Sequence, residues 1–357
     1  MLPNDSRDSS LLRTLHIRYL KRYLDILPGE LSSHDSTRLT IAFFTISGLD
    51  ILNALDDLDE AKKQNIIEWI YRLQILPNDS EREECRKASG FQGSSTLIFP
   101  DTELRCSKEY ACSHIAMTYT GLATLIILGD NLSRVDRGAI IEGLKALQQR
   151  DGSFCATLAG SESDMRFVYC AACICYMLRD WSGMNIEKTL EFIVNSMSYD
   201  YGIGQGPEQE SHGGTTFCAV ASLALMGRLE TTFSLKQLAG LRKWALSRQE
   251  SGFQGRPNKP VDTCYSFWVG ATLQLLEAFH MVDFKSNKEY ILSTQDRILG
   301  GFSKWPDTTP DPMHTCLGLG GLSLMKEKDL LPVHPGLNIT LRAHKHLEEI
   351  QRLWDDK

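Results

Sequence analysis

The chain has 357 residues, a formal net charge of −7 and a hydrophobic fraction of 42%. This hydrophobic fraction supports a large buried core and excludes a mostly disordered chain. The negative net charge argues against broad binding to nucleic acid, so an anionic ligand would need a local group of cations.

The positions of the ten cysteines and the lengths of the apolar runs indicate in which cellular compartment the protein resides. Most of the cysteines lie inside apolar, helix-like runs, and they are not spaced as a disulfide framework. No run approaches the about 18 to 20 consecutive apolar residues that cross a bilayer, and residues 1–10 lack the hydrophobic region of a signal peptide. We therefore expect a reduced, cytoplasmic protein that is not embedded in a membrane.

Three helices are predicted in the first part of the chain. Residues 11–27 form the first helix, which a Pro-Gly pair closes, and residues 37–55 form the second, which is apolar on most sides. Residues 62–76 carry apolar side chains at the spacing of an amphipathic helix. Residues 77–112 are polar and contain glycine and serine, so they predict only a long connection.

Beyond this connection the sequence repeats with a period of about 50 residues. A hydrophobic residue follows a glycine turn at intervals of 49, 50 and 49 residues, namely at Phe154, Ile203, Phe253 and Phe302. Apolar runs begin at intervals of 51, 48, 50 and 49 residues, namely at Thr118, Tyr169, Phe217, Phe267 and Cys316. The repeat predicts a series of similar structural units.

Each unit is predicted to be a hairpin of one helix that is apolar nearly all round and one that has a polar face. The first kind is buried and the second borders water. The apolar helices begin near residues 37, 114, 166, 214, 263 and 313, and the amphipathic ones include 11–27, 62–76, 134–149, 185–197, 234–248 and 286–293. We expect an all-α fold, a six-hairpin α/α barrel with inner and outer rings, that forms one domain over residues 1–357. An open solenoid is the competing architecture, but its concave surface would expose the apolar helices.

Polar residues recur just before or at the start of the inner helices. They are His114, Arg166, His212, Asp262 with Cys264, and His314. His212 and Asp262 are 50 residues apart, as are Cys264 and His314, and this distance is the length of the repeat. Inner helices of similar hairpins all start at the same end of a barrel, so we expect these side chains to meet at one rim of one cavity.

Asp262, Cys264 and His314 are the candidate metal ligands at this rim. Zn²⁺ binds carboxylate, thiolate and imidazole groups, and three protein ligands leave a fourth position open, as in catalytic zinc sites. His212 is the alternative third ligand. The sequence by itself leaves the choice between the two histidines open.

Three cations, Arg256, Lys259 and Lys304, precede the same rim. The N-termini of the inner helices add partial positive charge and free N–H groups. This combination predicts a diphosphate site, to which His212 and Tyr265 can add hydrogen bonds. An aromatic cavity behind such a rim suits a long apolar chain that ends in a diphosphate.

The sequence resembles the β subunits of protein prenyltransferases, and most closely those of type I protein geranylgeranyltransferases. The resemblance covers residues 11–345. The segments that carry it are S-H-I-A-M-T-Y-T-G-L (113–122), D-G-S-F-C-A (151–156), D-M-R-F-V-Y-C-A (164–171), E-S-H-G-G-T-T-F-C (210–218), G-R-P-N-K-P-V-D-T-C-Y-S-F-W-V-G (255–270) and S-T-Q-D-R (293–297).

The resemblance implies roles for individual residues. It makes Asp262, Cys264 and His314 the zinc ligands. The implied diphosphate contacts are His212, Arg256, Lys259 and Tyr265. Lys304 stands where the farnesyl enzymes carry an acidic Mg²⁺ ligand, so its charge would replace that metal, and Mg²⁺ would not be required.

The resemblance also implies residues that bind the two substrates. A small residue, Thr40, stands where the farnesyl enzymes have a tryptophan, which would deepen the pocket for a longer isoprenoid. Arg166 and Trp268 would line the same pocket. The implied contacts to the last residue of the peptide substrate are His114, Phe167 and Met313.

The implied activity is transfer of geranylgeranyl from its diphosphate to the cysteine of C-terminal Cys-a-a-X motifs, preferably with Leu or Phe at X. One Zn²⁺, a separate α subunit and protein substrates such as small GTPases are the implied partners. The β subunits of farnesyltransferase and Rab geranylgeranyltransferase are the nearest alternatives. Remoter alternatives are a terpene cyclase, whose acidic motif would be Asp56-Asp57-Leu58-Asp59, and a non-catalytic scaffold with structural zinc.

Overall fold

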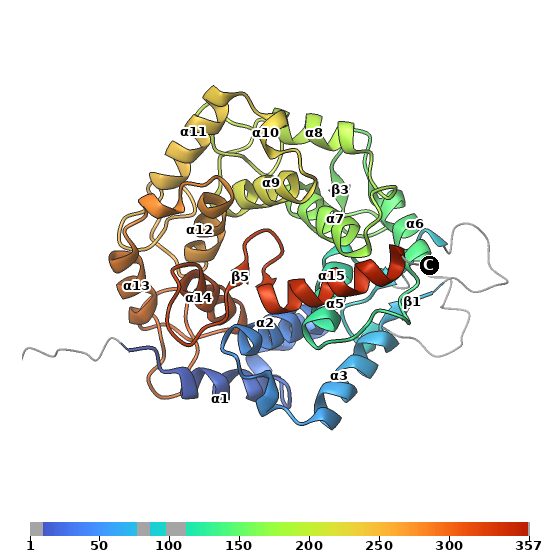
Figure 1. Ribbon diagram of the computed structural model, residues 1–357, viewed down its shortest axis with the longest axis horizontal. Coiled ribbons are helices and arrows are strands. Elements are labelled where there is room, and N and C mark those ends of the chain that lie inside the picture. Colours follow the sequence, from blue (N-terminus) through green and yellow to red (C-terminus); the bar gives the residue numbers. More distant parts are fainter. Residues whose placement is uncertain (1–9, 77–85, 98–111, 356–357) are drawn as a thin grey trace, which may run out of the picture.

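The computed structural model describes residues 10–76, 86–97 and 112–355. Six helices form an inner ring, with a second ring of helices outside it (Figure 1). The inner helices are α2 (Arg38–Ile51), α5 (Ile115–Ile127), α7 (Met165–Leu178), α9 (Gly213–Leu225), α12 (Tyr265–Leu275) and α14 (Pro312–Leu324). Each packs on the next, and α14 packs on α2. The ring is therefore closed, as predicted, and is not an open solenoid.

The outer ring also agrees with the predicted hairpins. It consists of α1 (Arg13–Tyr23), α3 (Glu60–Arg72), α6 (Arg137–Leu147), α8 (Ile186–Asn195), α11 (Leu235–Leu246) and α13 (Phe284–Ser293). Most of these helices are a few residues shorter than predicted, because the flanking polar residues form caps and turns, whereas α13 begins two residues earlier than predicted. Other short helical elements in the described part of the chain are α10 (Leu229–Thr232) and 3-10 turns at Gly29–Thr37, Leu55–Asp57, Ser95–Leu97 and Phe279–Met281.

Short antiparallel strand pairs connect some of these helices. They are β1 (Gln74–Ile75) with β2 (Gly90–Phe91), β3 (Phe154–Cys155) with β4 (Ser163–Asp164), and β5 (Val333–His334) with β6 (Ile339–Thr340). The predicted connection at 77–112 lies largely outside the described residues. Within its described part, β2 packs against α5.

The glycine turns that mark the repeat join each outer helix to the next inner helix. Phe154, Ile203, Phe253 and Phe302 all pair across the turn and are fully buried. Gly152 and Gly301 have positive φ angles of 94° and 89°, which other residues rarely adopt. A Cβ atom on Gly152 would lie 2.1 Å from the carbonyl oxygen of Lys188. The turns therefore need glycine to pack this closely against the next outer helix.

Backbone hydrogen bonds hold the inner helices in register at the end where they begin. The first N–H group of one helix donates to a carbonyl group of the following repeat. Examples are Ile115 to Ala156 at 2.9 Å, Met165 to Gln205 at 2.9 Å and Gly213 to Gly255 at 2.7 Å. All inner helices therefore start at one level. We call these helix starts, with the loops that lead to them, the rim.

The C-terminal segment covers the opposite end of the barrel, which we call the base. The hydroxyl groups of Tyr119 and Tyr169 donate to the carbonyl groups of Leu337 (2.9 Å) and Gly336 (3.1 Å). Helix α15 (Leu341–Asp355) then crosses this end over α5 (Figure 1). The sequence analysis did not predict α15, although its buried residues follow helical spacing.

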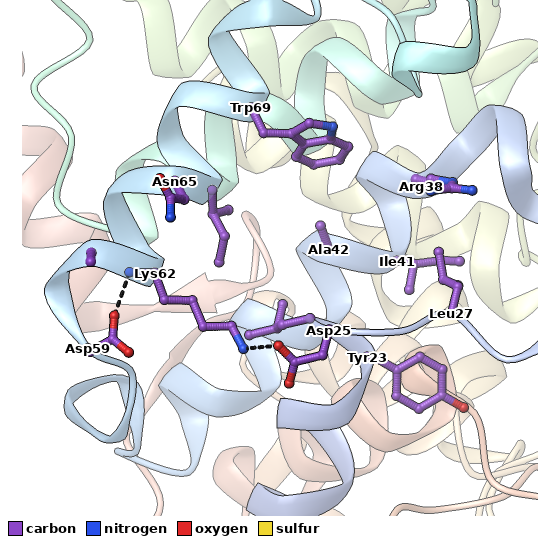
Figure 2. A pocket seen from close by; sticks show the side chains of 13 residues that line it. Tyr23, Asp25, Leu27, Arg38, Ile41, Ala42, Asp59, Lys62, Asn65 and Trp69 are labelled. Carbon is purple, nitrogen blue, oxygen red and sulfur yellow. Dashed lines mark hydrogen bonds and ion pairs between the residues drawn. The ribbon is translucent and has the colours of Figure 1, made fainter.

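Two cavities lie beside the first turns of α2. The larger, of about 710 Å³, lies on the outer wall between α1, α2 and α3 (Figure 2). An ion pair between Lys62 and Asp25 borders it, and Trp69 lies on its wall. No catalytic candidate lines it, so the larger cavity is not the predicted site. Among the described residues, no helix is long and apolar enough to cross a membrane.

Candidate active site at the rim

The recurrence of polar residues at the rim follows from helix capping. The first N–H groups of a helix lack partners within it, so the preceding side chain usually accepts from one of them. His114 and His212 cap α5 and α9 through Nδ1, which accepts from Ala116 at 3.1 Å and from Gly214 at 3.0 Å. Asp164 and Asp311 cap α7 and α14 with their carboxylates. In four of the six inner helices a capping side chain is thereby placed at the rim.

Asp262, Cys264 and His314 come together as the sequence predicts. One potential ligand atom of each residue lies within 4.8 Å of those of the other two, and all three side chains are buried. The Nε2 atom of His314 is 3.3 Å from a carboxylate oxygen of Asp262. Oxygen, sulfur and nitrogen donors at this separation fit Zn²⁺.

The hydrogen bonds of the two histidines favour His314 over His212 as the third ligand. His314 Nδ1 lies 2.5 Å from a carboxylate oxygen of Asp311 and donates to it, so Nε2, on the Asp262 side, is the nitrogen left to bind a metal once its proton is lost. His212 Nδ1 accepts a backbone N–H, so its proton is on Nε2. That Nε2–H group points to the hydroxyl oxygen of Tyr265, 3.0 Å away.

The electrostatics of the cluster also suit a cation. Burial acts to raise the pKa of Asp262, but hydrogen bonds from His314 and Cys264 outweigh it and hold this pKa below its usual value. Burial would lower the pKa of His314, but Asp262 and Asp311 raise it to about 9. Burial and the neighbouring Asp262 raise the pKa of the Cys264 thiol well above normal. A thiolate beside a buried carboxylate needs a positive partner, which a divalent metal provides.

The predicted diphosphate contacts lie next to this cluster. Lys304 Nζ is 3.8 Å from a carboxylate oxygen of Asp262 and 4.4 Å from the centre of the Trp305 ring. Arg256 is half-exposed and forms an ion pair with Glu210, and Lys259 is exposed. Burial, and then the charge of Arg256, lower the pKa of His212, so this imidazole is neutral at pH 7.

The smaller cavity, of about 500 Å³, opens at the rim between α2 and α14. Thr40 and Met313, two of the predicted substrate contacts, both line it. The Thr40 hydroxyl donates to the sulfur of Met117 at 3.4 Å, and Met117 also lines this cavity. The remaining lining residues are Leu31, His34, Thr37, Ile41, Phe44, Asp311 and Pro312.

The other predicted substrate contacts lie on neighbouring inner helices. The rings of His114 and Phe167 pack edge to face with centres 6.1 Å apart. Trp268 packs on Phe217 at 4.9 Å and is only partly buried. Arg166 is held by Asp164, with 2.6 Å between nitrogen and oxygen. These positions are compatible with the predicted pocket, and the roles of the residues remain predictions.

Sequence reasoning missed two acidic residues at the rim. Asp311 is bonded to His314 and caps α14. An aspartate before a proline at the start of an apolar run is a recognisable capping signal, so the sequence could have identified it. Glu210 contacts Arg256 from a loop 46 residues away. No local signal predicts that contact.

Three comparisons with known proteins agree with this geometry. A family model described as the prenyltransferase alpha-alpha toroid domain matches residues 11–339. The geranylgeranyl transferase type-1 subunit beta of Arabidopsis thaliana is 41% identical over 92% of this chain and 88% of that protein. The subunit of the same name from Dictyostelium discoideum is 38% identical over 91% of this chain and 94% of that protein.

A solved structure shows the same likeness in three dimensions. It is the structure of Candida albicans protein geranylgeranyltransferase-I complexed with GGPP. The match spans 96% of this chain and 99% of that chain, with 27% sequence identity and a TM-score of 0.84. The family match spans both rings and every candidate site residue. This chain therefore belongs to the prenyltransferase α/α toroid family.

Proposed function

We propose that this chain is the catalytic β subunit of a protein geranylgeranyltransferase type I. It transfers a geranylgeranyl group from geranylgeranyl diphosphate to the cysteine thiol of a C-terminal Cys-a-a-X motif, preferably with Leu or Phe at X. The observation that carries the proposal is the adjacency of the Asp262–Cys264–His314 cluster to Lys304 and to the His212–Tyr265 pair. The similarity to two type-1 β subunits supports it.

In this proposal Asp262, Cys264 and His314 hold one Zn²⁺ for each chain. A metal held by these residues would supply Lewis-acid chemistry, which would lower the pKa of the substrate thiol. Cys264 is then a ligand and not the nucleophile. Asp311 accepts the Nδ1 proton of His314 and fixes the orientation of the ring.

The leaving diphosphate gains charge when the bond from the substrate sulfur to C1 forms. The bond between C1 and oxygen breaks, and its electron pair goes to the diphosphate. Arg256, Lys259 and Lys304 stabilise this charge. Because His212 donates to the oxygen of Tyr265, the phenolic proton of Tyr265 is free to donate to the departing oxygen. In this proposal Lys304 supplies the charge for which other enzymes use Mg²⁺.

The substrate pocket continues from the rim into the barrel. Thr40 leaves room for the longer isoprenoid, and Arg166 and Trp268 line its path. At the peptide end, His114, Phe167 and Met313 contact the residue at X. The protein partners are a separate α subunit and Cys-a-a-X proteins such as small GTPases, and the enzyme acts in the cytoplasm as one β-subunit domain over residues 1–357.

A terpene cyclase receives no support from the acidic run at 56–59. The Asp59 side chain caps α3 by accepting from Lys62 at 2.6 Å, and Asp56 pairs with Lys63 at 3.5 Å. These carboxylates belong to the start of an outer helix and do not lie at the rim. They are therefore poorly placed to start a cyclisation in the barrel.

The test is to express this chain with an α subunit and to offer Cys-a-a-Leu and Cys-a-a-Met peptides. Each peptide is combined with geranylgeranyl or farnesyl diphosphate, with and without a zinc chelator or added Mg²⁺. We expect the highest rate for geranylgeranyl transfer to the Leu peptide, no gain from Mg²⁺ and loss of activity with the chelator. A preference for farnesyl transfer that depends on millimolar Mg²⁺ would favour a farnesyltransferase subunit instead.

A further inference from the structure

We propose that Glu210 competes with the diphosphate for Arg256. The carboxylate binds the guanidinium while no anion is present and gives it up when a diphosphate binds, so it controls how tightly the anion is held. The inference rests on the proposed function, because it takes Arg256 as a diphosphate contact. It adds a residue that weakens binding to a site otherwise described only by residues that strengthen it.

The contact joins two loops of the rim. Glu210 belongs to the loop before α9, and Arg256 to the loop before α12, and the distance between Arg256 Nη1 and Glu210 Oε2 is 2.9 Å. The side chains are 41% and 60% exposed for Arg256 and Glu210, so water and ligands reach both. A carboxylate oxygen and a phosphate oxygen make the same kind of charge-assisted bond to a guanidinium. One therefore replaces the other at little structural cost.

Three other carboxylates at the rim, Asp164, Asp262 and Asp311, have contacts that hold them in place. Asp164 caps α7 and binds Arg166, and Asp311 caps α14 and binds His314. Asp262 belongs to the metal cluster. Glu210 caps no helix, and its described bond is the ion pair with Arg256. It can leave its partner without unfolding a helix end or disturbing the metal site.

The backbone next to Glu210 is fixed, so only its side chain has to move. The Ser211 side chain is buried and its hydroxyl is bonded to Asp200, while the His212 N–H donates to the carbonyl group of Ile203 at 3.2 Å. These anchors hold the main chain that immediately follows Glu210. Rotation of an exposed side chain is fast compared with catalytic turnover. The exchange of partners therefore requires no loop movement.

An exposed ion pair is weak, which limits the size of the effect. Removing the competing carboxylate frees Arg256 to bind the anion. We expect E210Q to bind the diphosphate about three- to tenfold more tightly. The gain should shrink as salt is added, because salt screens exposed charges.

The experiment uses the complex of this chain with its α subunit. Titration calorimetry measures the affinity for geranylgeranyl diphosphate and for inorganic pyrophosphate in the wild type, E210Q, E210D and E208Q. E210D keeps the charge but shortens the reach, so it should also bind more tightly than the wild type. Glu208 is exposed in the same loop, and E208Q changes the net charge equally. E208Q should bind like the wild type.

A double-mutant cycle tests whether Glu210 acts through Arg256. The effect of E210Q should disappear in an R256Q background, because no guanidinium remains for the carboxylate to occupy. If the wild type binds the diphosphate and E210Q binds it with the same affinity, the role of Glu210 is overturned and the proposed function stays intact. The same holds if E208Q gains as much affinity as E210Q. A wild-type complex that binds neither anion would overturn the proposed function and this role together.

Discussion

At the base of the barrel, side chains of α15 bind carbonyl groups at the ends of the inner helices, whereas at the rim the capping residues keep one polar atom available. Arg342 donates to the carbonyl group of Ile127 at 2.7 Å, and Gln351 donates to that of Tyr176 at 2.8 Å. By contrast, His114 and His212 use Nδ1 as a cap and retain an Nε2–H group for another partner. At the base these helix ends are covered by α15, whereas at the rim the two capping histidines keep a polar atom available.

Two buried aspartates make the comparison sharper. At the base, Asp50 accepts from Thr340 at 2.6 Å and from Arg342 at 2.9 Å. Burial raises its pKa in spite of these partners. At the rim, the partners of Asp262 outweigh the effect of burial and lower its pKa. Burial by itself therefore does not identify a functional carboxylate; neighbouring groups that can themselves bind a metal do.

The largest expected effect comes from removing a candidate metal ligand at the rim. Cys264→Ala should lose zinc and reduce turnover by about 1,000-fold or more, because the metal contributes several kcal/mol to the reaction. Zinc content of the purified complex and the rate of peptide prenylation measure this. Cys316→Ala is the control, since Cys316 is a buried cysteine of α14 outside the cluster. Full zinc occupancy in Cys264→Ala would remove Cys264 from the ligand set.

Removing a buried hydrogen-bond acceptor at the base should reduce the stability of the fold and leave metal binding unchanged. Asp50→Ala leaves the Thr340 hydroxyl without its acceptor and Arg342 without its charge partner, so we expect a loss of about 3 kcal/mol. Asp50→Asn keeps an acceptor for Thr340 and should cost less. Thermal unfolding of the complex and zinc content of the folded fraction report the two properties separately. Loss of zinc with unchanged stability would contradict the division between base and rim.

Acid should also weaken the base through His334. Burial, and then the neighbouring His344, lower the pKa of His334 to about 4, below the usual value of 6.5. The unfolded chain therefore binds a proton that the folded chain rejects as the pH falls from 6.5 toward 4. Stability is complete above pH 6.5 and decreases across this range by up to about 3 kcal/mol, at about 1.4 kcal/mol for each pH unit.

Thermal unfolding of the complex between pH 7 and pH 5 measures this decrease. His334→Asn is a suitable control, because its side-chain oxygen can replace Nδ1 as the acceptor for the Leu337 N–H group. The variant should show a flatter pH profile than the wild type. An identical slope in both proteins would mean that other groups cause the acid sensitivity.

A matched pair of Tyr→Phe changes gives the smallest expected effects. Tyr119→Phe removes the hydroxyl that donates to Leu337 at the base, and should cost about 1 kcal/mol of stability with little effect on rate. Tyr265→Phe removes the hydroxyl beside His212 at the rim, and should lower turnover about tenfold with little effect on stability. Turnover rate and unfolding temperature are measured for both variants. If Tyr119→Phe mainly lowers the rate and Tyr265→Phe mainly lowers the unfolding temperature, the base does not chiefly serve stability and the rim does not chiefly serve activity.

The two rings and the position of the candidate site follow from periodic features of the sequence. Apolar runs and glycine turns about 50 residues apart require a repeated hairpin, because each apolar helix must be buried by its neighbours. The same period predicted that Asp262, Cys264 and His314 would meet, and they do. Periodic features are encoded locally, in each repeat, so they can be recognised without coordinates.

The use of the individual polar groups depends on the tertiary structure. It separated His314 from His212, because Asp311 holds one Nδ1 as a donor and a backbone N–H makes the other an acceptor. It also paired Glu210 with Arg256 and placed α15 across the base. The last two outcomes depend on atoms from different repeats or from the chain's two ends, and their separation in space is set by the closure of the ring. No single segment of the sequence contains that information.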